Sequence, residues 1–70
     1  MEKISINTEY IKLESLLKLA AVTGSGGEAK FVIGEGMVTV NGEVCTQRGK
    51  KLRPGDVVSF AGNDMEVVSV

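Results

Sequence analysis

The feature that most constrains the fold of this chain is Asn41-Gly42, which separates two short segments of alternating apolar and polar residues. Asparagine and glycine readily adopt the positive φ angles of a type I′ turn, and that turn has the twist that joins two antiparallel strands. The pair therefore predicts a tight β-hairpin over residues 37–46.

Two further turns organise the rest of the carboxyl-terminal half. The Pro-Gly-Asp sequence at 54–56 is typical of a β-turn and precedes a predicted strand over residues 57–60. Residues 61–64 are rich in turn formers and lead into a final predicted strand over residues 65–70. This half of the chain is therefore expected to form a series of antiparallel strands.

The amino-terminal half changes from strand to helix periodicity. Residues 3–7 alternate between polar and apolar side chains, which predicts a half-buried strand. The next apolar residues recur at helical spacing: Leu13, Leu16, Leu17 and Ala20. Other apolar side chains suggest that more than one neighbour covers this helix: Leu19, Ala21 and Val22. Gly24 is its expected end, because glycine commonly ends helices in the left-handed conformation.

A second helix is predicted from Ser25 onward. Ser25 and Glu28 have the spacing of a capping box, in which each side chain satisfies a free backbone N–H at the helix start. The expected buried stripe consists of Ala29, Val32 and Ile33. Gly36 stands where a left-handed residue would end the helix.

The order of the predicted elements is strand, helix, helix and a series of antiparallel strands. We therefore expect an α+β fold with two helices packed on a small, mainly antiparallel sheet. Seventy residues leave room for one hydrophobic core, so residues 1–70 are expected to form a single domain.

The composition argues against the commonest catalytic and metal-binding chemistries. The chain contains no histidine, the usual general base and metal ligand, and its one cysteine, Cys45, cannot build an ordinary zinc site. Its carboxylates and lysines show no recognisable nucleophile arrangement. We therefore expect a binding module and not an enzyme, with no catalytic residue, metal or cofactor.

Apolar runs in this sequence are short. The longest, residues 19–22, is far below the roughly 20 residues that span a bilayer. The amino end lacks a basic segment followed by an apolar stretch, so no secretory signal is expected. The interpretation is a cytoplasmic protein with no membrane partner, consistent with a single cysteine.

Positive charge is concentrated in one segment although the net charge of the chain is −1. A net charge this close to zero argues against a protein that coats nucleic acid indiscriminately. Half of the basic residues nevertheless fall within six positions: Arg48, Lys50, Lys51 and Arg53. This basic segment is either a solvated turn or a phosphate-binding surface. In an extended segment Lys50 and Lys51 face opposite ways, so only part of it would serve one surface.

The start of the second predicted helix is another candidate anion site. Gly26 and Gly27 let a ligand approach the backbone N–H groups, where the helix dipole favours a phosphate. Helical side chains lean toward the amino end, so Lys30 is expected to reach back over both glycines. The alternative is a plain helix cap and chain corner, with the carboxylate of Glu28 filling the site.

Phe31 lies on the side of this helix opposite to the apolar stripe. An aromatic ring there can stack on an unpaired base. We favour a core position instead, through a slight rotation of the helix or cover from the first strand, because large aromatic side chains are usually buried.

The order of these motifs resembles the RNA-binding domain first described in ribosomal small-subunit protein four. That family has a basic-Leu-acidic helix start, a Ser-Arg-x-x-Ala-Arg second helix start, an Ile-x-x-Gly-x-Val-x-Val-Asn-Gly hairpin and a Pro-Gly-Asp turn. The matching residues here are Leu13, Leu16, Ser25, Ala29, Lys30, Ile33, Gly36, Val38, Val40, Asn41, Gly42, Pro54, Gly55 and Asp56.

The free-standing single-domain members of that family, the YaaA/YbcJ-like proteins, are more similar still. Their Ser-Gly-Gly-x-Ala-Lys and Arg-Gly-basic-Lys-Leu segments fit residues 25–30 and 48–52. Gly26 stands where the wider family carries an arginine. One RNA contact expected from that family is therefore missing.

The resemblance implies the αL RNA-binding fold and RNA binding without catalysis. By family analogy the ligand is structured RNA, ribosomal or transfer RNA, bound mainly through its backbone. No preference for DNA is implied, and no protein partner is identified. Together with the charge pattern, the resemblance gives these expected RNA-binding residues: Lys12, Lys18, Ser25, Gly26, Gly27, Lys30, Phe31, Arg48, Lys50, Lys51 and Arg53.

Two other classes of function remain open on the sequence. Residues 38–44 and 52–58 also resemble segments of ubiquitin-like sulfur carriers, but those proteins end in a reactive Gly-Gly pair. This sequence ends in Val68-Ser69-Val70, which disfavours the carrier. A protein-interaction adaptor has no positive support, and nothing in the sequence forbids it.

Overall fold

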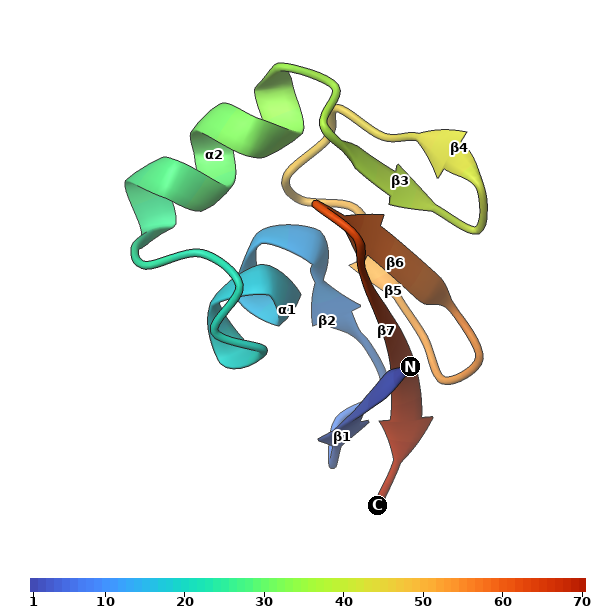
Figure 1. The fold of residues 1–70 in the computed structure, drawn as a ribbon. Helices are drawn as coiled ribbons and strands as arrows, with labels where there is room; N and C mark the ends of the chain where they lie inside the picture. Colours follow the sequence, from blue (N-terminus) through green and yellow to red (C-terminus); the bar gives the residue numbers. More distant parts are fainter.

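Apart from the two-residue strands β2 and β5, the helices and strands follow one another in the predicted order (Figure 1). The structure is a computed structural model that describes residues 1–70. Its elements are β1 (Glu2–Ile6), β2 (Ile11–Lys12), α1 (Leu13–Leu19), α2 (Gly26–Gly34), β3 (Val38–Val40), β4 (Glu43–Val44), β5 (Lys51–Leu52), β6 (Val57–Phe60) and β7 (Asn63–Ser69). Neither helix has the length and apolar character that a membrane crossing requires.

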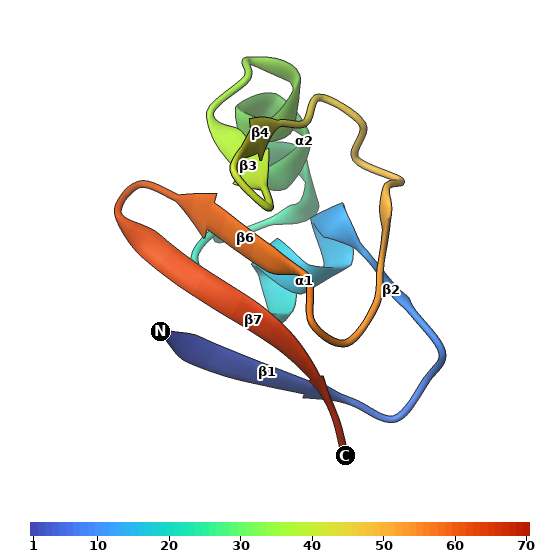
Figure 2. The same cartoon turned by 90° about the vertical axis from the view of Figure 1, so that its right-hand side faces the viewer.

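Five strands form the main sheet, in the order β1-β7-β6-β3-β4. Every neighbouring pair is antiparallel except β1 and β7, which run parallel. Both helices lie on one side of this sheet (Figures 1 and 2). The predicted α+β class and the mainly antiparallel sheet are confirmed, with one parallel pair that the sequence did not indicate.

A second, two-stranded sheet consists of β2 and β5. Each of its strands has two residues, which is too short to show a periodic pattern in the sequence. This ribbon places the end of the basic segment beside the start of α1. It is the element of the fold that the sequence patterns do not predict.

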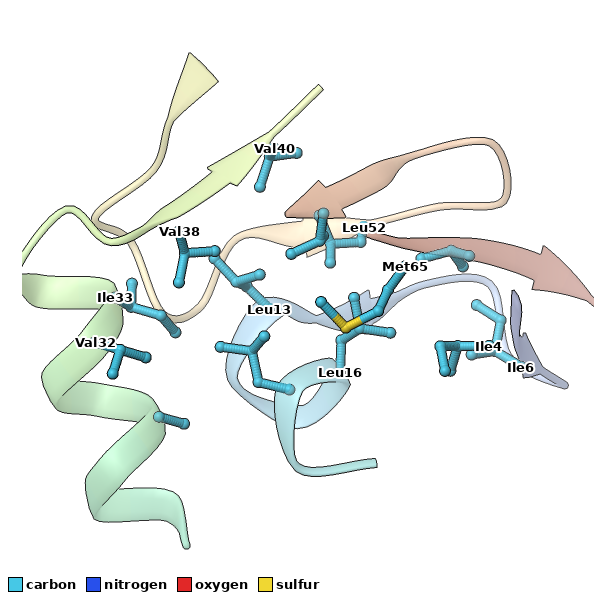
Figure 3. Packing of buried hydrophobic residues seen from close by; sticks show 14 residues of the cluster. Ile4, Ile6, Leu13, Leu16, Val32, Ile33, Val38, Val40, Leu52 and Met65 are labelled. Carbon is cyan, nitrogen blue, oxygen red and sulfur yellow. The ribbon is translucent and has the colours of Figure 1, made fainter. Parts of the chain in front are cut away.

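The core lies between the helices and the sheet (Figure 3). Alternate residues of β1 and β7 point into it, including Ile4, Met65 and Val67. Helix α1 contributes the expected leucines, and α2 contributes the predicted stripe. The fully enclosed side chains are Leu13, Leu16, Leu17, Ile33, Leu52, Met65, Val38, Val58 and Val67.

Helix α1 ends earlier than the sequence indicates, so Gly24 is not its terminator. Ala20 is the C-cap residue, and Ala21 adopts the left-handed conformation with φ 59°. The N–H of Val22 donates to the Leu17 carbonyl at 3.2 Å, which completes a Schellman motif. Val22 packs against the core, and this burial offsets the strain of a left-handed alanine.

Cover on several sides of α1 was also expected, and this is correct only in part. Leu13, Leu16 and Leu17 are enclosed, whereas Leu19 is 60% exposed. The helix stops at Leu19, so the apolar residues that follow belong to the turn and not to further helical faces.

The beginning and end of α2 agree with the predicted motifs. Ser25 Oγ accepts the N–H of Glu28 at 3.2 Å. Gly36 has φ 74°, and Met37 N–H donates to the Val32 carbonyl at 3.1 Å, which forms a second Schellman motif. The predicted start and end of this helix are therefore confirmed.

The predicted hairpin is also present. Asn41 and Gly42 have φ angles of 51° and 87°, and they join β3 to β4 as a two-residue turn. Strand β3 also pairs with β6, so the hairpin continues the main sheet beyond β6 and β4 forms its edge.

Candidate nucleic-acid interface

The β2–β5 ribbon places Lys12 directly opposite Lys51. Directly opposite residues of an antiparallel pair carry their side chains on one face, with Cβ atoms about 4.5–5.5 Å apart. Two like charges in this position destabilise a sheet. The pair therefore does not serve the stability of the ribbon, and it concentrates positive charge at the start of α1.

The backbone of the basic segment is fixed to the first turn of α1. Leu13 N–H donates to the Lys50 carbonyl at 2.9 Å, and Glu14 N–H donates to the Arg48 carbonyl at 3.1 Å. Helix starts leave such N–H groups without intrahelical partners, and here the basic segment supplies them. The segment is therefore held in place, and its charged side chains remain exposed.

An open groove of about 540 Å³ runs between the β3–β4 hairpin and the basic segment. Its lining residues are Val40, Asn41, Glu43, Val44, Cys45, Thr46, Gln47, Lys50, Lys51, Arg53 and Asp56. Three of the four cations of the basic segment share this groove, and Arg48 lies outside it.

The condition under which Lys50 and Lys51 were expected to face opposite ways, an extended segment, is not met. Strand β5 begins at Lys51, and Lys50 lies in a turn in which its N–H donates to the Gln47 carbonyl at 3.1 Å. Because the segment is not extended at this point, the alternation of a strand does not apply, and both lysines line the groove. The ammonium group of Lys51 also lies 4.9 Å from the centre of the Tyr10 ring, within the range of a cation–π contact.

Two acidic residues line the same groove, and their surroundings differ. The carboxylate of Asp56 is bound within its own turn, where Oδ2 accepts the N–H of Arg53 at 2.8 Å. Its Oδ1 accepts the amide of Asn41 at 3.1 Å. Glu43, on β4, is exposed and has no such partner among the side-chain hydrogen bonds.

At the start of α2 the capping arrangement differs in one detail from the capping box. The Glu28 carboxylate accepts the N–H of Gly24, one residue further back than the N-cap residue. Glu28 therefore turns toward the preceding linker. The N–H groups of Gly26 and Gly27 belong to the first turn, where the helix itself supplies no acceptor.

Lys18, at the end of α1, is the lysine that lies over this helix start. Its Nζ is 3.9 Å from the position that a Cβ would occupy at Gly26. No side-chain atom of Lys30 comes within 4 Å of such a position at Gly26 or Gly27. Next to the Cβ position of Gly26 the neighbouring lysine is thus Lys18 and not Lys30, whose reach over the two glycines stays a prediction. Because α1 ends at Leu19, Lys18 lies close to the corner between the two helices.

Phe31 is 62% exposed, so the interpretation of this residue as core is wrong. The buried stripe of α2 is limited to Ala29, Val32 and Ile33, on the other side of the helix. Strand β1, the expected cover, pairs with β7 at one edge of the sheet. An exposed ring on α2 is available to stack on a base.

These observations define a class of protein: a small α+β binding domain in which two short helices and a β-ribbon present a basic surface. Comparison with known proteins agrees with this class. The family model described as S4 domain matches residues 4–68. The chain therefore belongs to the S4 domain family, as the resemblance predicted.

Two relatives are similar over most of their length. The "Probable ribosome maturation protein RlbA" of Bacillus subtilis (strain 168) is 52% identical over 59 residues, which is 84% of this chain and 83% of that protein. YbcJ of Escherichia coli (strain K12) is 43% identical over 60 residues, 86% of each chain.

The solution structure of YbcJ from Escherichia coli, described as having an αL motif involved in RNA-binding, matches this fold. The TM-score is 0.75 at 40% identity, covering 97% of this chain and 87% of that one. The αL fold expected from the sequence is thus confirmed.

Proposed function

We propose that this chain is a non-enzymatic module that binds structured RNA. The observation that carries the proposal is the clustering of cations around the first turn of α1. Lys12 and Lys51 lie opposite each other there, and the backbone of Arg48 and Lys50 is fixed to the helix. An unfavourable like-charge pair becomes favourable when a phosphate lies over it.

The proposed contact surface extends from this cluster to the start of α2. Lys18 at the end of α1 and the N–H groups of Gly26 and Gly27 offer a second place for a phosphate. Ser25 caps the helix, and Phe31 and Lys30 extend the surface along α2. We assign the RNA contacts to these residues together with the basic segment.

The names of the relatives indicate the class of RNA. YbcJ is described as having a motif involved in RNA-binding, and RlbA is named for ribosome maturation. These descriptions favour ribosomal RNA, with transfer RNA as the other class. A single binding domain over residues 1–70, acting in the cytoplasm without catalysis or cofactor, completes the proposal.

The test compares the chain with a variant in which Arg48, Lys50, Lys51 and Arg53 are all glutamine. Binding is measured on ribosomal RNA, transfer RNA and a DNA duplex of equal length, over a range of salt concentrations. The wild type is expected to bind folded RNA more tightly than the DNA. The variant is expected to bind more weakly, with a slope against salt that is lower by about 0.7–0.9 for each phosphate that it no longer neutralises.

Thermal unfolding supplies the control, since exposed charges contribute little to stability. A folded variant with unchanged RNA affinity contradicts the assignment of the basic segment. A wild type that binds none of the RNAs at low salt contradicts RNA binding altogether and leaves a protein-interaction adaptor.

A further inference from the structure

The groove beside the β3–β4 hairpin contains a carboxylate, a hydroxyl and an amide group in addition to the cations that a phosphate would need. Its volume of about 540 Å³ falls in the range of small-ligand sites. Cations line it from residues 50–53, while Glu43 lines it from the hairpin. Thr46 and Gln47 add hydroxyl and amide groups between these two parts.

The cations of the groove have no hydrogen-bonded side-chain partner, although the ammonium group of Lys51 lies over the Tyr10 ring. The side-chain hydrogen bonds of the structure use none of the ammonium or guanidinium groups of Lys50, Lys51 and Arg53. These groups form short, strong hydrogen bonds with phosphate oxygens. The backbone of Lys50 is already held by α1, which reduces the entropy lost when a phosphate binds.

Glu43 is the residue that a site for phosphate alone does not explain. The carboxylate of Asp56 is bound within its turn, whereas that of Glu43 is exposed in the same groove. A carboxylate repels a phosphate, but it accepts hydrogen bonds from the amino group of a base, as in carboxylate recognition of cytosine N4.

We propose that this groove binds one unpaired nucleotide of the RNA, with its phosphate on Lys50, Lys51 and Arg53 and the amino group of its base on Glu43. This inference rests on the proposed RNA binding and adds the kind of nucleotide that is recognised. Bases in a duplex are stacked and paired, so a base enters the groove only from a loop or a bulge. Uracil has a carbonyl oxygen where cytosine has the amino group, so Glu43 discriminates against it.

The test uses three RNA hairpins with the same stem: fully paired, with one bulged cytidine, and with one bulged uridine. The wild-type chain is expected to bind the cytidine bulge at least about fivefold more tightly than the other two. In Glu43→Gln the preference for cytidine over uridine is lost. Affinity for the fully paired hairpin stays equal or rises in this variant, because a negative charge has been removed.

Glu2→Gln is the matched control, because Glu2 is an exposed glutamate on β1, at the opposite edge of the sheet from β4. It removes the same charge and is expected to keep the cytidine preference. A titration with cytidine 5′-monophosphate, followed by amide NMR, is expected to shift the signals of Lys50 and Lys51 more than uridine 5′-monophosphate does.

Equal binding of all three hairpins by the wild type overturns this inference and leaves the proposed RNA binding intact. A cytidine preference that persists in Glu43→Gln also overturns it. Failure to bind any hairpin or ribosomal RNA overturns both proposals together.

Discussion

The side-chain amide of Asn41 donates to Asp56 Oδ1 at 3.1 Å, so the tip of the hairpin is joined to the Pro-Gly-Asp turn. Asn41 Oδ1 accepts the N–H of Val57 at 2.9 Å, and the backbone N–H of Asn41 donates to the Val57 carbonyl at 2.7 Å. Asn41 and Asp56 belong to separate sequence motifs, yet their side chains together hold the hairpin against the Pro-Gly-Asp turn. Together they fix one wall of the groove.

Replacing Asn41 by glycine is expected to destabilise the chain. Glycine retains the positive φ of the turn, so the change isolates the lost side-chain hydrogen bonds. The free energy of unfolding is expected to fall by about 1–3 kcal/mol in a denaturant titration. Ala61→Gly is the control, because Ala61 occupies a similar turn at φ 52° and is expected to show no loss. Equal losses in both variants contradict a role for the amide.

The left-handed alanine at the end of α1 predicts a stabilising substitution. Ala21→Gly relieves the strain of φ 59° and makes the unfolded chain more flexible, which offsets part of the gain. The free energy of unfolding is expected to rise by about 0.5–1 kcal/mol. Thermal or denaturant unfolding measures this, and a loss of stability would show that the alanine methyl group packs usefully.

The opposed lysines of the ribbon predict a gain in stability together with weaker binding. Lys12→Gln removes the repulsion with Lys51, so the free energy of unfolding is expected to rise by about 0.2–1 kcal/mol while RNA affinity falls. Lys3→Gln is the control, because Lys3 lies opposite Glu66. It is expected to lower stability slightly and to leave RNA affinity unchanged. Denaturant unfolding and RNA titrations on the same samples measure both effects, and a Lys12→Gln variant with unchanged RNA affinity would contradict the prediction.

Charge reversal distinguishes the two lysines proposed near the start of α2, Lys18 at the end of α1 and Lys30 within α2. Lys18 lies over Gly26, so Lys18→Glu is expected to reduce RNA affinity more than Lys30→Glu does, with the fold intact in both. RNA titrations at one salt concentration measure the difference. The reverse order would show that Lys30 moves over the helix start when RNA binds.

Glycine-to-alanine changes in α2 test whether a ligand contacts the backbone at the start of this helix. A Cβ at Gly27 meets only Ser25 Oγ, at 3.9 Å, so Gly27→Ala is expected to stabilise the helix by up to about 1 kcal/mol and to hinder a ligand at the backbone. A Cβ at Gly34 meets nothing within 4 Å, so Gly34→Ala is expected to stabilise α2 without affecting RNA affinity. Unchanged affinity in all of these variants would leave the α2 start as a cap and corner.

The exposed ring of Phe31 predicts a loss of binding without a loss of fold. Phe31→Ala is expected to weaken RNA binding by about 1–3 kcal/mol, the range of one stacked base, and to change stability by less than about 0.5 kcal/mol. Leu19→Ala removes another exposed apolar side chain and serves as the control in the same RNA titration. Similar losses in both variants would indicate general surface effects instead of stacking.

Features encoded by neighbouring residues were predictable. The cap at Ser25, the stripe of α2, the left-handed Gly36 and the Asn41-Gly42 turn each depend on a few adjacent positions, and all are confirmed. The end of α1 was not predictable from adjacent residues, because Ala21 adopts a left-handed conformation that is rare for alanine. The packing of Val22 against the core stabilises that conformation. That packing depends on the completed core.

The candidate site depends on long-range pairing, which local patterns do not contain. Clustering of charge identified the basic segment, but the pairing of Lys12 with Lys51 requires two strands of two residues each. Glu43 was not identified as a site residue either, because the cations that share its groove lie several residues further along the chain. Phe31 is a different case, because its helical spacing indicated the exposed side correctly and the general preference of aromatic side chains for burial was given more weight.

Because β1 pairs with β7, the main sheet is complete only after both strands have been synthesised, and RNA binding is expected to begin at that stage. Both helices, the ribbon and the groove lie between these two strands in the chain. Ile4 and Ile6 reach their buried positions on an edge strand whose one neighbour in the sheet is β7, the last strand of this domain. Closing so long a loop is slow, and the amino end emerges from the ribosome first. A nascent chain is therefore expected to engage RNA only after β7 has left the ribosome.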